Sequence, residues 1–257
     1  MEILIICIAA FLTAIMTFFS GFGLGTILTP IFMLFFPVDL AIALTGVVHF
    51  LNNIFKVILV GRNANKQVLL RFGIPAVAAS FLGAWVLLHI PDARPLFDYD
   101  FAGRHFEVYP VKFIISVLLL IFALMDLLPF LKKLSFGREK LPLGGALSGF
   151  FGGLSGNQGA LRSAFLIKAD LSKEAFIGTA VVVSTFVDLT RLSVYASRFL
   201  ASGLTDNLYI VIPAVISAIS GAYLGNKLLK KVTIQSIQLI VALMLIALSL
   251  ALGMGIV

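Results

Sequence analysis

Long apolar runs, separated by short polar stretches, occupy most of this chain. They predict helices or half-helices at residues 3–20, 24–36, 40–60, 68–90, 110–131, 142–155, 159–168, 174–197, 207–229 and 233–256. An apolar run of roughly 20 residues is long enough to cross the hydrocarbon core of a bilayer as a helix. The pattern therefore predicts an all-α polytopic membrane protein.

The apolar pattern is present twice. The letters IPAV at residues 74–77, followed after five residues by GA at 83–84, recur as IPAV at 212–215 and GA at 221–222. A duplicated hydrophobic unit is typical of secondary transporters. The duplication divides the chain into a first transmembrane repeat at residues 1–131, a cytoplasmic linker at 132–141 and a second repeat at 142–257.

The charged loops predict the orientation of these helices. Four loops hold 12 of the 19 lysine and arginine residues: Arg62, Lys66 and Arg71; Lys132, Lys133, Arg138 and Lys140; Lys168 and Lys173; and Lys227, Lys230 and Lys231. Because the cytoplasmic loops of membrane proteins are rich in such residues, we assign these four loops to the cytoplasm. The loop at residues 91–109 has more acidic than basic residues, which indicates that it lies outside.

This assignment gives the two halves opposite topologies. Residues 142–168 begin and end on the cytoplasmic side, so they form a hairpin that enters and leaves by one face. By the same logic residues 1–36 begin and end outside. Each half is then a hairpin followed by three crossings, which predicts inverted repeats with both chain termini outside.

The arms of the second hairpin are too short to span. At a rise of about 1.5 Å per residue, residues 142–155 and 159–168 form arms of about 21 Å and 15 Å. Because the hydrocarbon core is about 30 Å thick, this hairpin should be re-entrant. The first hairpin has a longer outer arm that nearly spans, and its tip should also lie at membrane depth.

Both hairpin tips are rich in glycine and offer groups that bind anions. A half-helix that begins inside the membrane presents free N–H groups and the positive end of its dipole. The tip residues predicted to contact a substrate are Gly23, Gly25, Thr26, Asn157, Gln158, Gly159 and Arg162. The alternative is that the glycines only allow close helix packing.

Polar side chains also form one stripe on each of two predicted helices. The first stripe comprises Thr45, His49, Asn52, Asn53 and Lys56, and Ser184, Asp188 and Arg191 stand 135 residues after His49, Asn53 and Lys56. Ionisable groups inside a membrane are costly, so they usually face a cavity or a partner. Three alternatives stay open: an Asp188–Arg191 structural ion pair, a Lys56 that extends to the membrane interface, and a His49 that only packs.

Composition and charge exclude several classes of protein. The chain is 60% hydrophobic and 12% charged, more apolar than a soluble domain of 257 residues could bury. Its net charge of +7 is explained by the loops, so we predict no nucleic-acid partner. Cys7 is the single cysteine, and neither H-E-x-x-H, G-x-S-x-G nor a Walker A motif occurs. We therefore predict no metal, no cofactor and no enzymatic activity, and any uphill transport must use an ion gradient.

The glycine-rich tips and the paired helices resemble one known family. The letters SGFGLGTILTP at residues 20–30, SGFFGGLSG at 148–156 and the repeated IPAV…GA pattern resemble the TauE/SafE family of sulfite exporters. The resemblance covers essentially the whole chain. It implies a membrane exporter of small sulfur-containing anions, such as sulfite or organosulfonates, usually in the bacterial cytoplasmic membrane.

These observations together predict a secondary transporter that exports sulfite or an organosulfonate such as sulfoacetate, with proton coupling. Arg162 and Arg191 would hold the anion near the midplane. The remaining predicted substrate contacts in the stripes and the second tip are Asn52, Asn53, Lys56, Asn157 and Gln158. His49 and Asp188 are the candidates for proton coupling. A passive channel for small oxyanions is the alternative. The predicted partners are the anion and the lipid bilayer.

Overall fold

The computed structural model of the protein describes residues 1–20, 23–90, 94–128, 136–156, 158–201, 203–228 and 234–256. Four of its helical stretches are long and apolar enough to cross a membrane: Leu40–Asn63, Lys66–His89, Lys173–Ser197 and Thr205–Lys227. Shorter apolar helices include Glu2–Phe18, Pro110–Met125 and Ala242–Gly253. The predicted helical character is confirmed.

The first half of the chain is helical apart from one hairpin. Its elements are α1 (Glu2–Ser20), α2 (Gly25–Met33), α3 (Val38–Val60), the 3₁₀ turn η1 (Gly61–Asn63), α4 (Lys66–Val68), the π-helical η2 (Leu69–Gly73), α5 (Ile74–His89), β1 (Phe97–Phe101), β2 (Arg104–Val108) and α6 (Pro110–Leu127). The region predicted as one helix at 68–90 is helical as far as His89. Residues 69–73, between α4 and α5, form a π-helical segment within it.

The second half follows the same order of helices. Its elements are η3 (Arg138–Lys140), α8 (Leu141–Ser155), α9 (Gly159–Leu166), α10 (Lys173–Ala201), η4 (Thr205–Asn207), α11 (Leu208–Leu228) and α12 (Ile234–Gly253). The short arms predicted for the second hairpin are present as α8 and α9, which have 15 and 8 residues.

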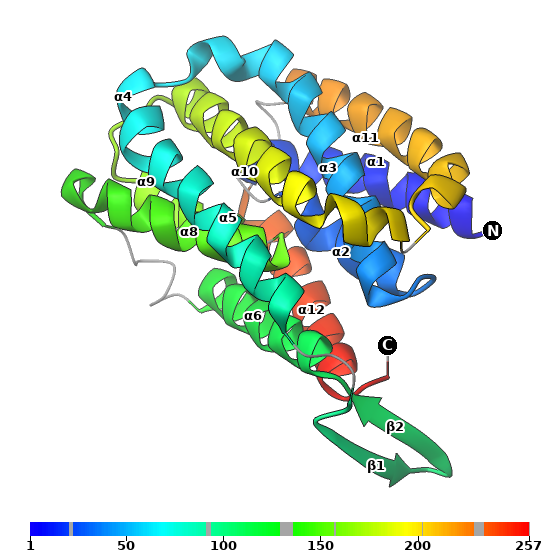
Figure 1. Ribbon diagram of the computed structural model, residues 1–257. Coiled ribbons are helices and arrows are strands. Elements are labelled where there is room, and N and C mark those ends of the chain that lie inside the picture. Colours follow the sequence, from blue (N-terminus) through cyan, green and yellow to red (C-terminus); the bar gives the residue numbers. More distant parts are fainter. Residues whose placement is uncertain are drawn as a thin grey trace.

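Part of the loop predicted at residues 91–109 forms a β-hairpin, which was not predicted. Strands β1 and β2 pair antiparallel through a turn in which Ala102 and Gly103 have positive φ. This two-residue turn suits the twist of the strands. Figure 1 shows the hairpin beyond the ends of α6 and α12, and Tyr99 Oη donates a 2.6 Å hydrogen bond to the carbonyl of Met254. The pKa of His105 in β2 is raised because Asp100 accepts a hydrogen bond from its imidazole.

Helices from the two halves pack against each other in pairs. The closely packed pairs are α1 with α11, α5 with α8, α3 with α10 and α6 with α12, and Figure 1 shows α1 and α11 side by side, as well as α6 and α12. Each pair joins one helix from the first half of the chain with one from the second half. The central pair, α3 with α10, carries the two polar stripes.

Glycines set the distance between α5 and α8. A Cβ atom added to Gly145, Gly149 or Gly153 of α8 would collide with the backbone carbonyl of Phe72, Ala76 or Ser80, respectively. A Cβ atom added to Gly221 of α11 would likewise collide with the backbone carbonyl of Phe11 in α1. Close approach of backbones through small residues is how helices associate in lipid, where the hydrophobic effect does not drive helices together.

Gly149→Ala should therefore lower the stability of the protein by about 1–3 kcal/mol, the usual cost of overpacking. Gly73→Ala is the matched control, because its added Cβ would meet only Val183 Cγ2, at 3.4 Å. Thermal unfolding of the purified proteins in detergent measures the difference. Equal melting temperatures for the two variants would contradict the role of Gly149 as a backbone contact.

Candidate functional site

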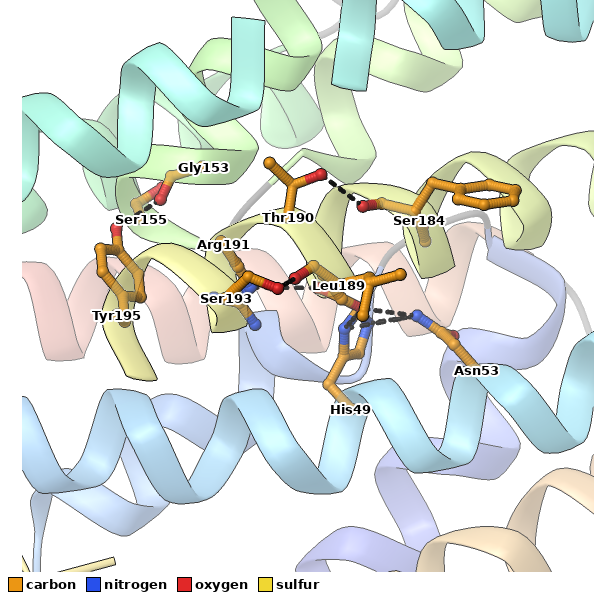
Figure 2. Close-up of polar contacts among 12 residues, drawn as sticks. His49, Asn53, Gly153, Ser155, Ser184, Leu189, Thr190, Arg191, Ser193 and Tyr195 are labelled. Atoms are coloured by element: carbon orange, nitrogen blue, oxygen red, sulfur yellow. Dashed lines mark hydrogen bonds and ion pairs between the residues drawn. The ribbon is translucent and has the colours of Figure 1, made fainter. Parts of the chain in front are cut away.

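The two polar stripes face each other between α3 and α10. Figure 2 shows His49 and Asn53 on α3 directed toward α10. The side chains of the stripes are almost fully buried, with exposures of 1% for His49 and Asp188 and 3% for Asn53, Lys56 and Arg191. Buried ionisable groups persist only where partners or ligands compensate their charge.

The carboxylate of Asp188 is the centre of this contact. His49 Nδ1 lies 2.6 Å from Asp188 Oδ2, and Asn53 Nδ2 donates to the same oxygen at 2.9 Å. Arg191 Nε donates to Asp188 Oδ1 at 3.1 Å. The Asp188–Arg191 ion pair that the sequence left open as an alternative is thus present. It compensates the buried negative charge.

A small cavity lies beside the His49–Asp188 contact. Its walls come from α1, α3, α9, α10 and the first hairpin tip, and the lining residues are Thr17, Phe18, Gly23, His49, Asn53, Lys56, Arg162, Ile177, Ala180, Val181 and Ser184. Its water-accessible volume is about 20 Å³. That is room for about one water molecule. An anion with three oxygen atoms could therefore enter only if the cavity became wider.

Two buried cations stand on the wall of this cavity. Arg162 of α9 is 2% exposed, and its Nη1 donates to the Ser184 hydroxyl of α10. Lys56 Nζ lies 5.5 Å from the centroid of the Phe18 ring. Within the described part of the chain Lys56 forms no ion pair with a carboxylate. The nearest buried acid, Asp188, already pairs with Arg191, so the cavity wall carries excess positive charge.

The hairpin tips reach the stripes through backbone contacts. A Cβ atom added to Gly23 would lie 2.8 Å from His49 Nε2, and one added to Gly25 would lie 3.8 Å from the carbonyl oxygen of Gly156. Gly156 ends α8 with φ of +77°, a conformation that glycine adopts without strain. The tip before α2 and the tip after α8 therefore meet beside His49.

The structure separates the predicted substrate contacts and proton-coupling candidates into two groups. Gly23, His49, Asn53, Lys56 and Arg162 line the cavity. The cavity lining does not include the other described ones, which are Gly25, Thr26, Asn52, Gln158, Gly159, Asp188 and Arg191. Asn157 lies outside the described residues. Of the two arginines expected to hold the anion, Arg162 lines the cavity and Arg191 does not.

Some lining residues were not among the predicted contacts. Thr17 and Phe18 come from the last turn of α1, and Ile177, Ala180 and Val181 extend the face of α10 that carries Ser184. Residues 177, 180 and 184 are three and four positions apart, as on one face of a helix. Ile177 and Ala180 could therefore have been predicted from Ser184 of the second stripe. Nothing in the sequence places the end of α1 beside Lys56, because that depends on how α1 packs on α11.

Comparison with known proteins identifies the family. The model of the family described as sulfite exporter TauE/SafE matches residues 6–252. No curated protein and no solved structure matches the chain significantly. The match extends over nearly the whole chain and includes the four long apolar helices. The chain therefore belongs to the TauE/SafE family of sulfite exporters and is a polytopic membrane transporter, not an enzyme.

Proposed function

We propose that this protein exports sulfite, or an organosulfonate such as sulfoacetate, across the bacterial cytoplasmic membrane by proton-coupled secondary transport. The observation that carries the proposal is the pair of buried cations, Arg162 and Lys56, on the wall of one small cavity. Family membership supports a small sulfur anion as the substrate.

The cavity has the chemistry to recognise a sulfur oxyanion. The guanidinium of Arg162 can donate two parallel hydrogen bonds to two oxygens of a sulfite or sulfonate group. Lys56 adds a point charge, and the Ser184 hydroxyl, now held by Arg162, can turn to the third oxygen. The apolar side chains of Phe18 and Val181 also line the cavity, and apolar surroundings strengthen such contacts.

His49 links the cavity to the buried carboxylate, which supports a role in proton coupling. Its Nδ1 contacts Asp188, and its Nε2 faces Gly23 at the hairpin tip. A histidine can gain or lose a proton near neutral pH. Protonation of His49 would strengthen its hold on Asp188 and add positive charge beside the anion. Anion binding and proton binding would then favour each other.

The contact pattern supports inverted repeats as the architecture for this transport. In order along the two halves, α1, α3, α5 and α6 correspond to α8, α10, α11 and α12. Exchange of the two halves therefore turns the pair α5–α8 into α11–α1 and leaves the pairs α3–α10 and α6–α12 unchanged. In this arrangement the two hairpins enter the membrane from opposite faces, and both termini lie outside. Relative movement of the halves would open the cavity to one side at a time.

Transport by reconstituted protein tests the proposal. Proteoliposomes should accumulate radiolabelled sulfite or sulfoacetate against its concentration gradient when a pH gradient is imposed, and should not do so when the gradient is collapsed. Anion flux that follows the membrane voltage and ignores pH would instead indicate a passive channel. Absence of flux and of ligand-induced thermal stabilisation for every sulfur anion would contradict the proposed substrate class.

A further inference from the structure

A second group of unused polar atoms lies on the other side of the His49–Asp188 contact. Helices α3 and α10 are antiparallel, because Gly46 of α3 faces Arg191 while Gly178 of α10 faces Val60. The cavity with Lys56 lies toward one end of this helix pair. Arg191 and Thr45 lie toward the other end, so the His49–Asp188 contact separates the two positions.

The guanidinium of Arg191 is only partly used by its partner. Its Nε donates to Asp188, whereas its Nη2 is buried and has no hydrogen-bond partner among the residues that the structure describes. A Cβ atom added to Gly46 would lie 3.5 Å from this Nη2, and one added to Gly156 would collide with Nη1. The unused edge of the guanidinium therefore points to the space between α3 and the hairpin tips.

Thr45 supplies a second unused group beside the same space. It precedes Gly46, is 1% exposed, and its Oγ1 likewise has no hydrogen-bond partner in the described ranges. Its Cγ2 lies 3.6 Å from a Cβ atom added to Gly25, the first residue of α2. A buried charged donor and a buried hydroxyl without partners are costly, so both indicate a ligand or water that completes them.

The first turn of α2 adds positive potential at this place. Helix α2 has nine residues and begins at Gly25, and its N-cap residue Leu24 makes no side-chain hydrogen bond. The N–H groups of Thr26 and Ile27 already donate to the carbonyls of Gly23 and Leu24, so this turn would attract an anion mainly through the positive end of the helix dipole. Two unused donors and a helix N-terminus therefore converge from three separate elements, α10, α3 and α2.

We propose that Arg191 Nη2, Thr45 Oγ1 and the first turn of α2 form a second anion position on the transport path. It would receive the sulfite or sulfonate group as that group leaves the cavity of Arg162 and Lys56. During this transfer Arg191 Nε stays hydrogen-bonded to Asp188, and the His49 side chain moves to let the anion pass. This inference rests on the proposed function, because it assumes that an anion enters the first cavity.

Substitution of Thr45 tests the second position without touching the cavity. Thr45→Val removes the hydroxyl at nearly constant volume and breaks no hydrogen bond with a described residue. In proteoliposomes it should slow sulfite transport at least tenfold, while sulfite binding to the purified protein stays within threefold of the unmodified protein. Thr45→Ser, which returns the hydroxyl, should restore the rate. Thr190→Val is the matched control, because Thr190 Oγ1 only donates to the carbonyl of Phe186 in its own helix.

Arg191→Lys provides an independent test should Thr45→Val fold poorly. Lysine can still neutralise Asp188 but has no Nη2, so a purely structural ion pair would tolerate this change. The second position predicts slowed transport with binding retained. If Thr45→Val and Arg191→Lys both transport sulfite at the unmodified rate, the second position is wrong and the proposed function stands. If the unmodified protein neither binds nor transports sulfite or sulfoacetate, the proposed function itself is wrong and the second position falls with it.

Discussion

Arg162→Ala should reduce sulfite binding and transport by about 100-fold or more while the protein remains folded. Arg162 is buried on the cavity wall and is positioned by Ser184. Hydrogen bonds to charged groups contribute about 1.5–3 kcal/mol each, and two lost bonds of this kind exceed the 2.8 kcal/mol that corresponds to about 100-fold in affinity. Folding should survive, because removal of a buried cation also removes its desolvation cost.

Two further variants make this result specific to the cavity. Arg138→Ala removes a half-exposed arginine of η3 that pairs with Asp170 and the carbonyl of Ala169, so it should leave transport unchanged. Arg162→Lys keeps the charge but loses the parallel donors, and should give intermediate affinity. Thermal stabilisation by sulfite and flux in proteoliposomes measure binding and transport separately. Normal flux in Arg162→Ala would exclude this cavity as the substrate site.

Gly23→Ala should also abolish transport, through a steric effect on His49. The new methyl group would lie 2.8 Å from His49 Nε2, closer than carbon and nitrogen normally approach, so the imidazole must turn away. That movement breaks the 2.6 Å contact between His49 Nδ1 and Asp188. Loss of this buried contact should cost about 1–3 kcal/mol of stability and uncouple transport from the pH gradient.

Gly25→Ala separates this steric effect from a general intolerance of the hairpin tip. Its added methyl group would meet Thr45 Cγ2 at 3.6 Å and the Gly156 carbonyl oxygen at 3.8 Å, both ordinary contacts. The melting temperature should therefore fall far less than in Gly23→Ala. Equal loss in both variants would show that the tip requires glycine for another reason, such as flexibility during transport.

The helices could be predicted because each long apolar run has one physical explanation, burial in lipid. The polar stripes could also be predicted, because His49, Asn53 and Lys56 have helical spacing. Their equivalents, Ser184, Asp188 and Arg191, follow 135 residues later. The short strands β1 and β2 were missed because their charged residues were interpreted as a charged loop, although aromatic and acidic residues alternate along β1. The alternation in residues 97–101 was nevertheless a usable signal.

The different surroundings of Arg162 and Arg191 could not be predicted from the sequence. Arg162 and Arg191 are both single cations within apolar segments, so the sequence gives them similar roles. Their difference arises from tertiary packing: α9 brings Arg162 to Ser184, whereas Arg191 lies one turn from Asp188 on α10 and binds it. Likewise, Phe18 reaches Lys56 only because α1 ends beside α3.

The pairing of α1 with α11 has a consequence for how the protein is made. Helix α1 leaves the ribosome long before Gly221, the glycine of α11 that fits against it. Helices α3, α5 and α6 must likewise wait for α10, α8 and α12. The N-terminal half therefore enters the bilayer with its packing surfaces uncovered, and assembly finishes only when the last helices arrive. The four most extensive helix pairs thus each need both halves of the chain.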